Sequence, residues 1–136
     1  MALLNLDALL NGYVAGERTK VDRARKAGVK IAFGSDCWFG YAGKTRGQMT
    51  RLVLESLQTA FGMTAADALR SATVGAAELL NSPNVSGAID VGSFADLIAV
   101  DGDPLARVAD LEKIVFVMKG GAVIRDDVRA RPAPQS

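Results

Sequence analysis

The residue pattern of this 136-residue chain changes abruptly at Ser82-Pro83-Asn84, and this change limits the folds that the chain can adopt. Before this point good helix formers dominate, and apolar residues recur at helical spacing. Beyond it the apolar residues come in short runs between turn-forming residues, which is typical of β-strands. We therefore expect an α/β chain in three parts: residues 1–82 with the helices, residues 83–128 rich in strands, and a flexible tail over residues 129–136.

The first part is expected to hold helices around one buried strand. The strand is predicted at residues 29–33, a short mainly apolar run that Gly28 and Gly34 enclose. The helices follow from apolar residues at helical spacing, with Thr64 and Thr73 as N-caps of the two shortest. We expect them at residues 17–27, 49–60, 65–71 and 74–80.

The second part is expected to be mainly strand. Its short apolar runs lie at residues 89–91, 95–100, 114–118 and 122–124. Turn chemistry separates them, and the acids of Asp101-Gly102-Asp103-Pro104 are interpreted as turn formers rather than as a calcium loop. The strongest hairpin signal joins the last two runs around Lys119-Gly120-Gly121.

Composition excludes several classes of protein. Sixteen basic and fifteen acidic residues leave a net charge of +1, which argues against a broad electrostatic surface for nucleic acid. No apolar run approaches the roughly 20 residues of a membrane span, and no secretory signal opens the chain. Cys37 is the only cysteine, so the chain has no internal disulfide. We expect a cytoplasmic protein without a nucleic-acid or membrane partner.

The chain contains no histidine. This excludes Ser–His and Cys–His catalysis, and every histidine-ligated metal site, from residues of this chain alone.

Asp36 is the candidate catalytic and metal-ligating residue. It lies just past the carboxyl end of the strand predicted at residues 29–33, and in β/α folds the loops at that edge converge on one mouth, where reactive groups collect. The carboxylate is therefore a candidate metal ligand or proton acceptor. The alternative is that Asp36 only caps a turn or the following helix.

The same loop carries candidate substrate contacts. Lys44 and Arg46 are placed to meet an anionic substrate, unless they are ordinary solvated charges. Trp38, with Phe39 and Tyr41, either lines a substrate pocket or forms an exposed apolar patch. Cys37 is interpreted as a small packing residue.

Three segments carry a family resemblance. They are AGVKIAFGSD, then GKTRGQMTRLVLESLQTAFGMTAADALRSATVGAAELL, and then GAIDVGSFADLIAVDGDPL, with FVMKGGAVI following. In this order they resemble the C-terminal third of a metal-dependent amidohydrolase, in the imidazolonepropionase-like and prolidase-like branch. The resemblance covers residues 17–125.

The resemblance implies a (β/α)8 barrel with a small β-sandwich built from both chain ends. Residues 29–33 would then be the eighth barrel strand. If they form no strand, what the resemblance implies for this segment is wrong. Asp36 would be the aspartate that binds zinc or another divalent metal and takes a proton from the attacking water. The implied reaction is hydrolysis of an amide or other C–N bond.

The chain also departs from the family pattern. The family's metal site uses a His-x-His pair, further histidines and often a modified lysine, and a (β/α)8 barrel needs about 250 residues. The chain is therefore interpreted as a C-terminal fragment of such a barrel with part of the sandwich, inactive alone and without a tightly bound metal. Its expected partner is a missing N-terminal barrel half or further copies of itself. The alternative function is a non-catalytic, oligomerising or partner-binding module derived from that fold.

A monomer would need an internal cover for its apolar surfaces. Leucines near the N-terminus are the candidates, folding back as a helix: Leu3, Leu4, Leu6, Leu9 and Leu10.

Overall fold

The computed structural model describes residues 6–82 and 86–128. Four helices come first, followed by three strands and one short 3-10 helix. The helices are α1 (Leu6–Lys26), α2 (Arg46–Thr59), α3 (Ala65–Ala72) and α4 (Val74–Leu79). The later elements are β1 (Leu97–Val100), η1 (Val108–Glu112), β2 (Ile114–Lys119) and β3 (Ala122–Asp126). This order agrees with the predicted change from helix to strand. Pro83, Asn84 and the tail predicted at residues 129–136 lie outside the described residues.

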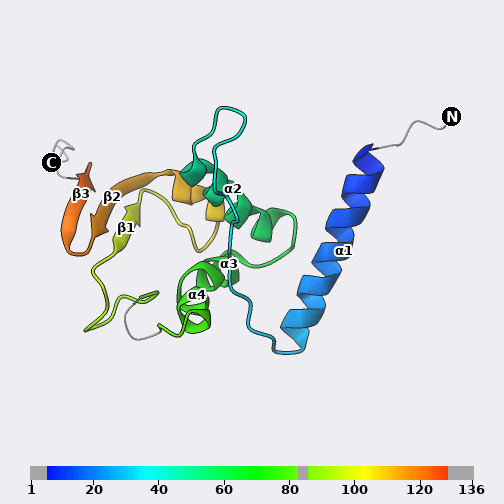
Figure 1. Ribbon diagram of the computed structural model, residues 1–136, viewed down its shortest axis with the longest axis horizontal. Helices are drawn as coiled ribbons and strands as arrows, with labels where there is room; N and C mark the ends of the chain where they lie inside the picture. The colour runs from blue at the N-terminus through cyan, green and yellow to red at the C-terminus, as the bar shows by residue number, and fades with distance from the viewer. Residues whose placement is uncertain (1–5, 83–85, 129–136) are drawn as a thin grey trace, which may run out of the picture.

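The elements are arranged along one direction (Figure 1). Helix α1 stands to one side, the three-stranded sheet lies at the opposite end, and α2, α3, α4 and η1 lie between them. Near its C-terminal end α1 is tied to the rest by an ion pair between Arg25 and Asp67 of α3. The helix expected at residues 17–27 begins earlier, at Leu6, and extends away from the body (Figure 1). The alternative, in which the N-terminal leucines fold back as a cover, is not what the described part of α1 shows, and Leu3 and Leu4 lie outside the described residues.

Threonine N-caps set the first residues of α2 and α3. Helix α2 begins at Arg46 rather than at Met49, because Thr45 forms a capping box with Gln48 that the sequence analysis did not identify. Helix α3 follows the prediction: Thr64 is its N-cap and accepts a hydrogen bond from the Asp67 amide at 3.1 Å.

Thr73 stands at the predicted N-cap position of α4, but the capping hydrogen bond expected of it is absent. The Thr73 hydroxyl donates instead to the Leu69 carbonyl, 2.9 Å away in α3.

The strand predicted at residues 29–33 is not formed. The Phe33 amide donates to the Ser71 carbonyl at 2.9 Å, but the amides of Lys30, Ile31 and Ala32 have no backbone acceptor among the described residues. The side chain of Val29, predicted to be buried, is 57% exposed. The physical reason is that a strand is defined by hydrogen bonds to a neighbouring strand, and no described strand lies beside this segment.

The predicted hairpin is confirmed. Strands β2 and β3 pair antiparallel, with Lys119 opposite Ala122 across the turn. Gly120 and Gly121 both have positive φ, 56° and 81°, as a tight two-residue hairpin turn requires.

The third strand of the sheet is β1, which pairs antiparallel with β2 and places Leu97 opposite Met118. The strand predicted at residues 89–91 is wrong. Ile89 is 88% exposed, and this segment has no partner strand among the described residues.

The buried core is small and lies between the helices and η1. Its buried residues come from α2, α3 and η1: Leu54, Ala65, Ala68 and Val108. Phe33 and Leu57 pack against them. Val108 is wholly buried, so the strand-rich part of the chain contributes to the same core as the helices. Among residues 6–82 and 86–128, no helix combines the length and apolar character needed to cross a bilayer.

Candidate functional site

Asp36 lies in the irregular segment that leads into α2. Its backbone has a positive φ of 51°, in the left-handed region that aspartate tolerates better than most residues with a Cβ. The side chain is exposed to solvent. The carboxylate is therefore accessible from solvent.

Two hydroxyl groups anchor the chain on either side of Asp36. The Ser35 Oγ lies 3.2 Å from the Thr50 Oγ1 of α2. The Cys37 amide donates to the same Ser35 Oγ at 3.3 Å. Cys37 itself is partly exposed, not buried as its interpretation as a packing residue implied.

A short backbone bridge closes the outer part of this loop. Tyr41 and Lys44 exchange two backbone hydrogen bonds, of 3.1 and 3.0 Å. A Cβ at Gly40 would lie 2.5 Å from the Lys44 carbonyl oxygen, so this close approach requires glycine.

The aromatic residues of the loop form an exposed patch. The rings of Trp38 and Phe39 meet edge to face, with centroids 5.0 Å apart, and Trp38 is 78% exposed. Phe39 and Tyr41 are exposed as well, so in the described chain the patch is open to solvent.

The remaining candidate substrate residues follow the aromatic patch along the chain: Lys44 belongs to the loop bridge, and Arg46 is the first residue of α2. Lys44 and Arg46 are exposed, and in the described part of the chain neither forms an ion pair with Asp36. These two cations are free to meet an external anion.

The described residues do not provide a metal site. They contain no group of three or more aspartate, glutamate, cysteine or histidine side chains close enough to hold an ion. A hydrolytic zinc site normally has three protein ligands. One exposed carboxylate does not meet this requirement, so a complete metal site would need ligands beyond the described residues.

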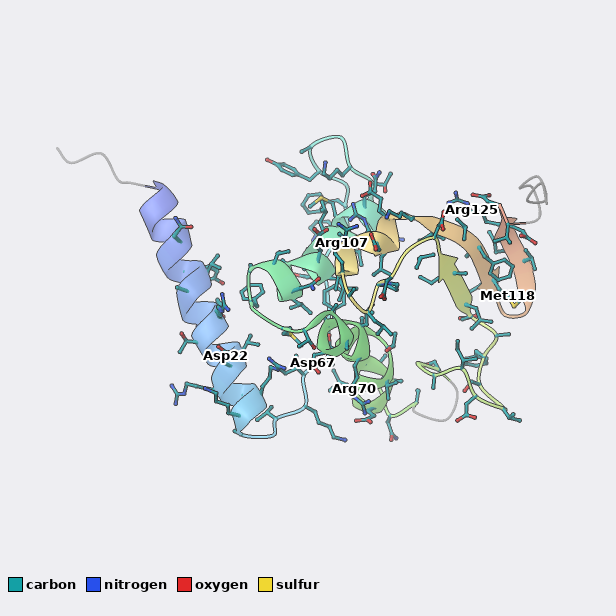
Figure 2. All side chains as sticks on the ribbon, turned by 180° about the vertical axis from the view of Figure 1, so that it is seen from behind. Asp22, Asp67, Arg70, Arg107, Met118 and Arg125 are labelled. Carbon is teal, nitrogen blue, oxygen red and sulfur yellow. The ribbon has the colours of Figure 1, made fainter. Side chains whose placement is uncertain are left out.

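A charged hollow that the sequence analysis did not anticipate lies between the end of α1 and helices α3 and α4. Its volume is about 320 Å³, and two ion pairs line it, Arg25 with Asp67 and Lys30 with Glu78. Figure 2 shows Asp67 on the side of α3 that lies towards α1. The hydrogen bond from Lys30 lowers the pKa of the Glu78 carboxyl. No periodicity signal could have found this hollow, because its charges come from segments far apart in the sequence.

Among the acids of the strand-rich part, Asp103 acts as a turn former, as expected, whereas Asp96 binds the turn of a hairpin far along the chain. Asp103 accepts hydrogen bonds from the amides of Leu105 and Ala106. Asp96 accepts from the Gly120 amide at 2.6 Å and pairs with Lys119, and these contacts, that with Lys119 first, lower the pKa of its carboxyl.

Comparison with known proteins identifies the family. The sequence model of the amidohydrolase family matches residues 5–124. Imidazolonepropionase from Pseudomonas fluorescens is 36% identical over 104 residues, covering 73% of this chain and 25% of the relative. A solved Xaa-Pro dipeptidase with bound methionine in its active site has a TM-score of 0.66 and 34% identity, covering 79% of this chain and 25% of the dipeptidase. The ochratoxinase of A. niger also has a TM-score of 0.66, with 28% identity, and the match covers 90% of this chain and 27% of the ochratoxinase.

The fold is thus an α/β amidohydrolase fold. The chain belongs to the amidohydrolase family, in its imidazolonepropionase-like and prolidase-like branch. It spans about a quarter of the length of these relatives. The missing strand at residues 29–33 does not overturn the resemblance, because that strand depends on neighbours that the described chain does not contain.

Proposed function

We propose that this chain is the C-terminal part of a metal-dependent hydrolase of amide or other C–N bonds, and that Asp36 is the catalytic residue it contributes. The observation that carries the proposal is the family match over residues 5–124, in a chain that spans only a quarter of its relatives. In this proposal Asp36 supplies one metal ligand and accepts a proton from the attacking water. The β1–β3 sheet is part of a composite sandwich, and the whole enzyme is cytoplasmic.

The proposed substrate contacts lie on the loop of Asp36 and at the start of α2. Trp38 offers an exposed apolar surface, while Lys44 and Arg46 offer two exposed cations that form no ion pair among residues 6–82 and 86–128. A substrate with an apolar group and a carboxylate matches this combination. The names of the relatives, imidazolonepropionase and Xaa-Pro dipeptidase, are consistent with an acyl or amino-acyl compound of this kind.

The isolated chain is proposed to be inactive. Zinc needs about three protein ligands to acidify its bound water, and this sequence has no histidine. A partner polypeptide with the histidine-bearing barrel strands would complete the site. It would also offer backbone groups to Lys30, Ile31 and Ala32, whose amides have no backbone acceptor among the described residues.

The test compares the chain alone with the chain mixed with a histidine-bearing N-terminal segment of an amidohydrolase, both with zinc. We expect no hydrolysis of acyl-amino acids, dipeptides or cyclic amides by the chain alone. We expect zinc-dependent hydrolysis by the mixture, lost in Asp36→Asn. Hydrogen exchange supplies a second readout, because the amides of residues 30–32 should become protected only in the mixture. Zinc-dependent turnover by the chain alone that disappears in Asp36→Ala would overturn the proposal.

The second candidate function is a non-catalytic module that binds copies of itself or another protein. The exposed apolar side chains of the sheet favour it, among them Ile98, Val123 and Ile124. Light scattering on the chain alone, together with the activity of the mixture, separates the two functions. An assembly that forms without the N-terminal segment, and a mixture without activity, would favour the module.

A further inference from the structure

We propose that the hydroxyl groups of Ser35 and Thr50 form a clamp that fixes the backbone of Asp36, which makes both of them positioning residues. The inference rests on the proposed function in one respect, since the position of Asp36 matters for catalysis only if its carboxylate reacts. The clamp itself is a feature of this chain and can be tested without catalysis.

The clamp holds the residues on both sides of Asp36. Ser35 reaches the Thr50 Oγ1 across 3.2 Å, and the Cys37 amide donates to the same Ser35 Oγ at 3.3 Å. Ser35, Cys37 and Thr50 are all partly shielded from solvent, whereas Asp36 between them is exposed. One oxygen atom therefore ties both neighbours of Asp36 to helix α2.

Thr50 differs from the other hydroxyl residues of α2. Ser56 and Thr59 donate to carbonyls of their own helix, those of Val53 and Glu55. This is the usual local bond of a helical hydroxyl residue. Thr50 instead bonds to a loop residue fifteen positions earlier in the sequence. Its helix is fixed at its start by the capping box of Thr45 and Gln48, so Thr50 gives the loop a rigid anchor.

Asp36 needs such an anchor because its backbone has a positive φ of 51°. A positive φ is unfavourable for a residue with a Cβ and persists only where the surroundings enforce it. No hydrogen bond or ion pair of the Asp36 side chain is present in the part of the chain that the structure describes. The conformation is thus held from its two neighbours, and release of either should let the loop open.

Cys37 allows a direct measurement, because it is the only thiol of the chain and belongs to the clamp. The experiment measures the rate at which a thiol reagent modifies native Cys37. The variants are Ser35→Ala and Thr50→Val, with Thr50→Ser as the conservative rescue and Thr59→Val as the matched control on the same helix. Thr50→Val loses one hydrogen bond of the clamp and should raise the modification rate about fivefold, while Ser35→Ala loses two and should raise it at least as much. Thr50→Ser should restore it, and Thr59→Val should leave it unchanged.

Two results would overturn the clamp: unchanged Cys37 reactivity in Ser35→Ala and Thr50→Val, or an equal rise in Thr59→Val. Far-UV circular dichroism monitors folding, and Ser35→Ala, a loop substitution, decides the question if Thr50→Val unfolds. In the active mixture with the N-terminal segment, Thr50→Val should lower kcat with KM unchanged, and Thr50→Ser should restore it. A raised Cys37 rate with an unchanged kcat would overturn the positioning role. A wild-type mixture without activity would count against the proposed function, while Cys37 would still decide the clamp.

Discussion

Asp110 organises the loop between β1 and η1 through one buried carboxylate. It accepts hydrogen bonds from the Arg107 guanidinium at 2.7 Å and the Asp103 amide at 3.1 Å, and it pairs with Lys113 at 3.1 Å. A Cβ at Gly102 would lie 2.9 Å from its carboxylate, so the loop passes closely over it. These contacts, the Arg107 hydrogen bond first, lower the pKa of Asp110 to about 2.

The lowered pKa of Asp110 predicts how the stability of the fold depends on pH. Because the folded-state pKa lies below the ordinary value of 3.8, the carboxylate stabilises the fold above pH 4 and loses this effect as the pH falls towards 2. Unfolding by urea at pH 5, 4, 3 and 2.5 should show wild-type stability falling more steeply than that of Asp110→Asn. Glu78→Gln, which removes another carboxyl whose pKa is lowered, should likewise reduce the dependence of stability on pH. Parallel pH dependence in wild type and Asp110→Asn would contradict the role assigned to Asp110.

Single residues also show which features the sequence could predict. Local signals succeeded: Thr64 caps α3, and the Gly120-Gly121 turn closes the hairpin, because each depends on neighbours within a few positions. Asp110 gave no signal, since its partners become visible only when the loop has folded around it. Asp36 was identified from its place after an apolar run and from the resemblance, whereas its clamp needs the contact with Thr50.

At the scale of elements, the side-chain amide of Gln58 in α2 makes two hydrogen bonds to the strand-rich part. The Gln58 Nε2 donates to the Ala106 carbonyl at 3.1 Å, and its Oε1 accepts from the Val108 amide at 3.0 Å. Val108 is wholly buried, so its amide has no access to water as a substitute partner.

Removal of this amide should therefore destabilise the whole chain. Gln58→Leu leaves the buried Val108 amide without its acceptor, which costs about 1–3 kcal/mol. The free energy of unfolding from urea titrations should fall by that amount, with an unchanged slope. Thr59→Val, the next residue of α2, should change stability by less than about 0.5 kcal/mol, as is usual at exposed positions. An equally small effect of Gln58→Leu would show that the Gln58 hydrogen bonds do not hold α2 and η1 together, and that their other contacts, the apolar core and the Arg51–Glu112 ion pair, are sufficient.

The strands show why the rest of the fold could not be predicted. Residues 114–124 contain both partners of a pairing and form the hairpin as expected. Residues 29–33 have the composition of a strand but no described partner, and they stay irregular. Periodicity reports that a segment suits a sheet, whereas pairing depends on what lies beside it. The candidate site is incomplete for the same reason, because it combines one residue of this chain with ligands that the chain does not supply.

At the scale of the whole molecule, the structure leaves much apolar surface in water. No residue of the β1–β3 sheet is fully buried. Ile98 and Val117 share one face of the sheet, while Met118 and Val123 lie on the other. Helix α1 extends from the body rather than covering it (Figure 1). A two-faced apolar sheet of three strands is stable only when another layer covers it.

We therefore predict that the chain alone associates with itself at micromolar concentration. Covering each large apolar side chain contributes about 1.5–3 kcal/mol, so a few of them on the sheet match much of the stability of a small domain. Size exclusion with light scattering should give a mass above 14.3 kDa that rises with concentration. Ile98→Lys places a charge on the sheet and should shift the mass towards the monomer, while Tyr13→Lys on α1 should not. A monomer that unfolds cooperatively and keeps its mass at tens of micromolar would contradict self-association, since such a chain must cover its sheet from within.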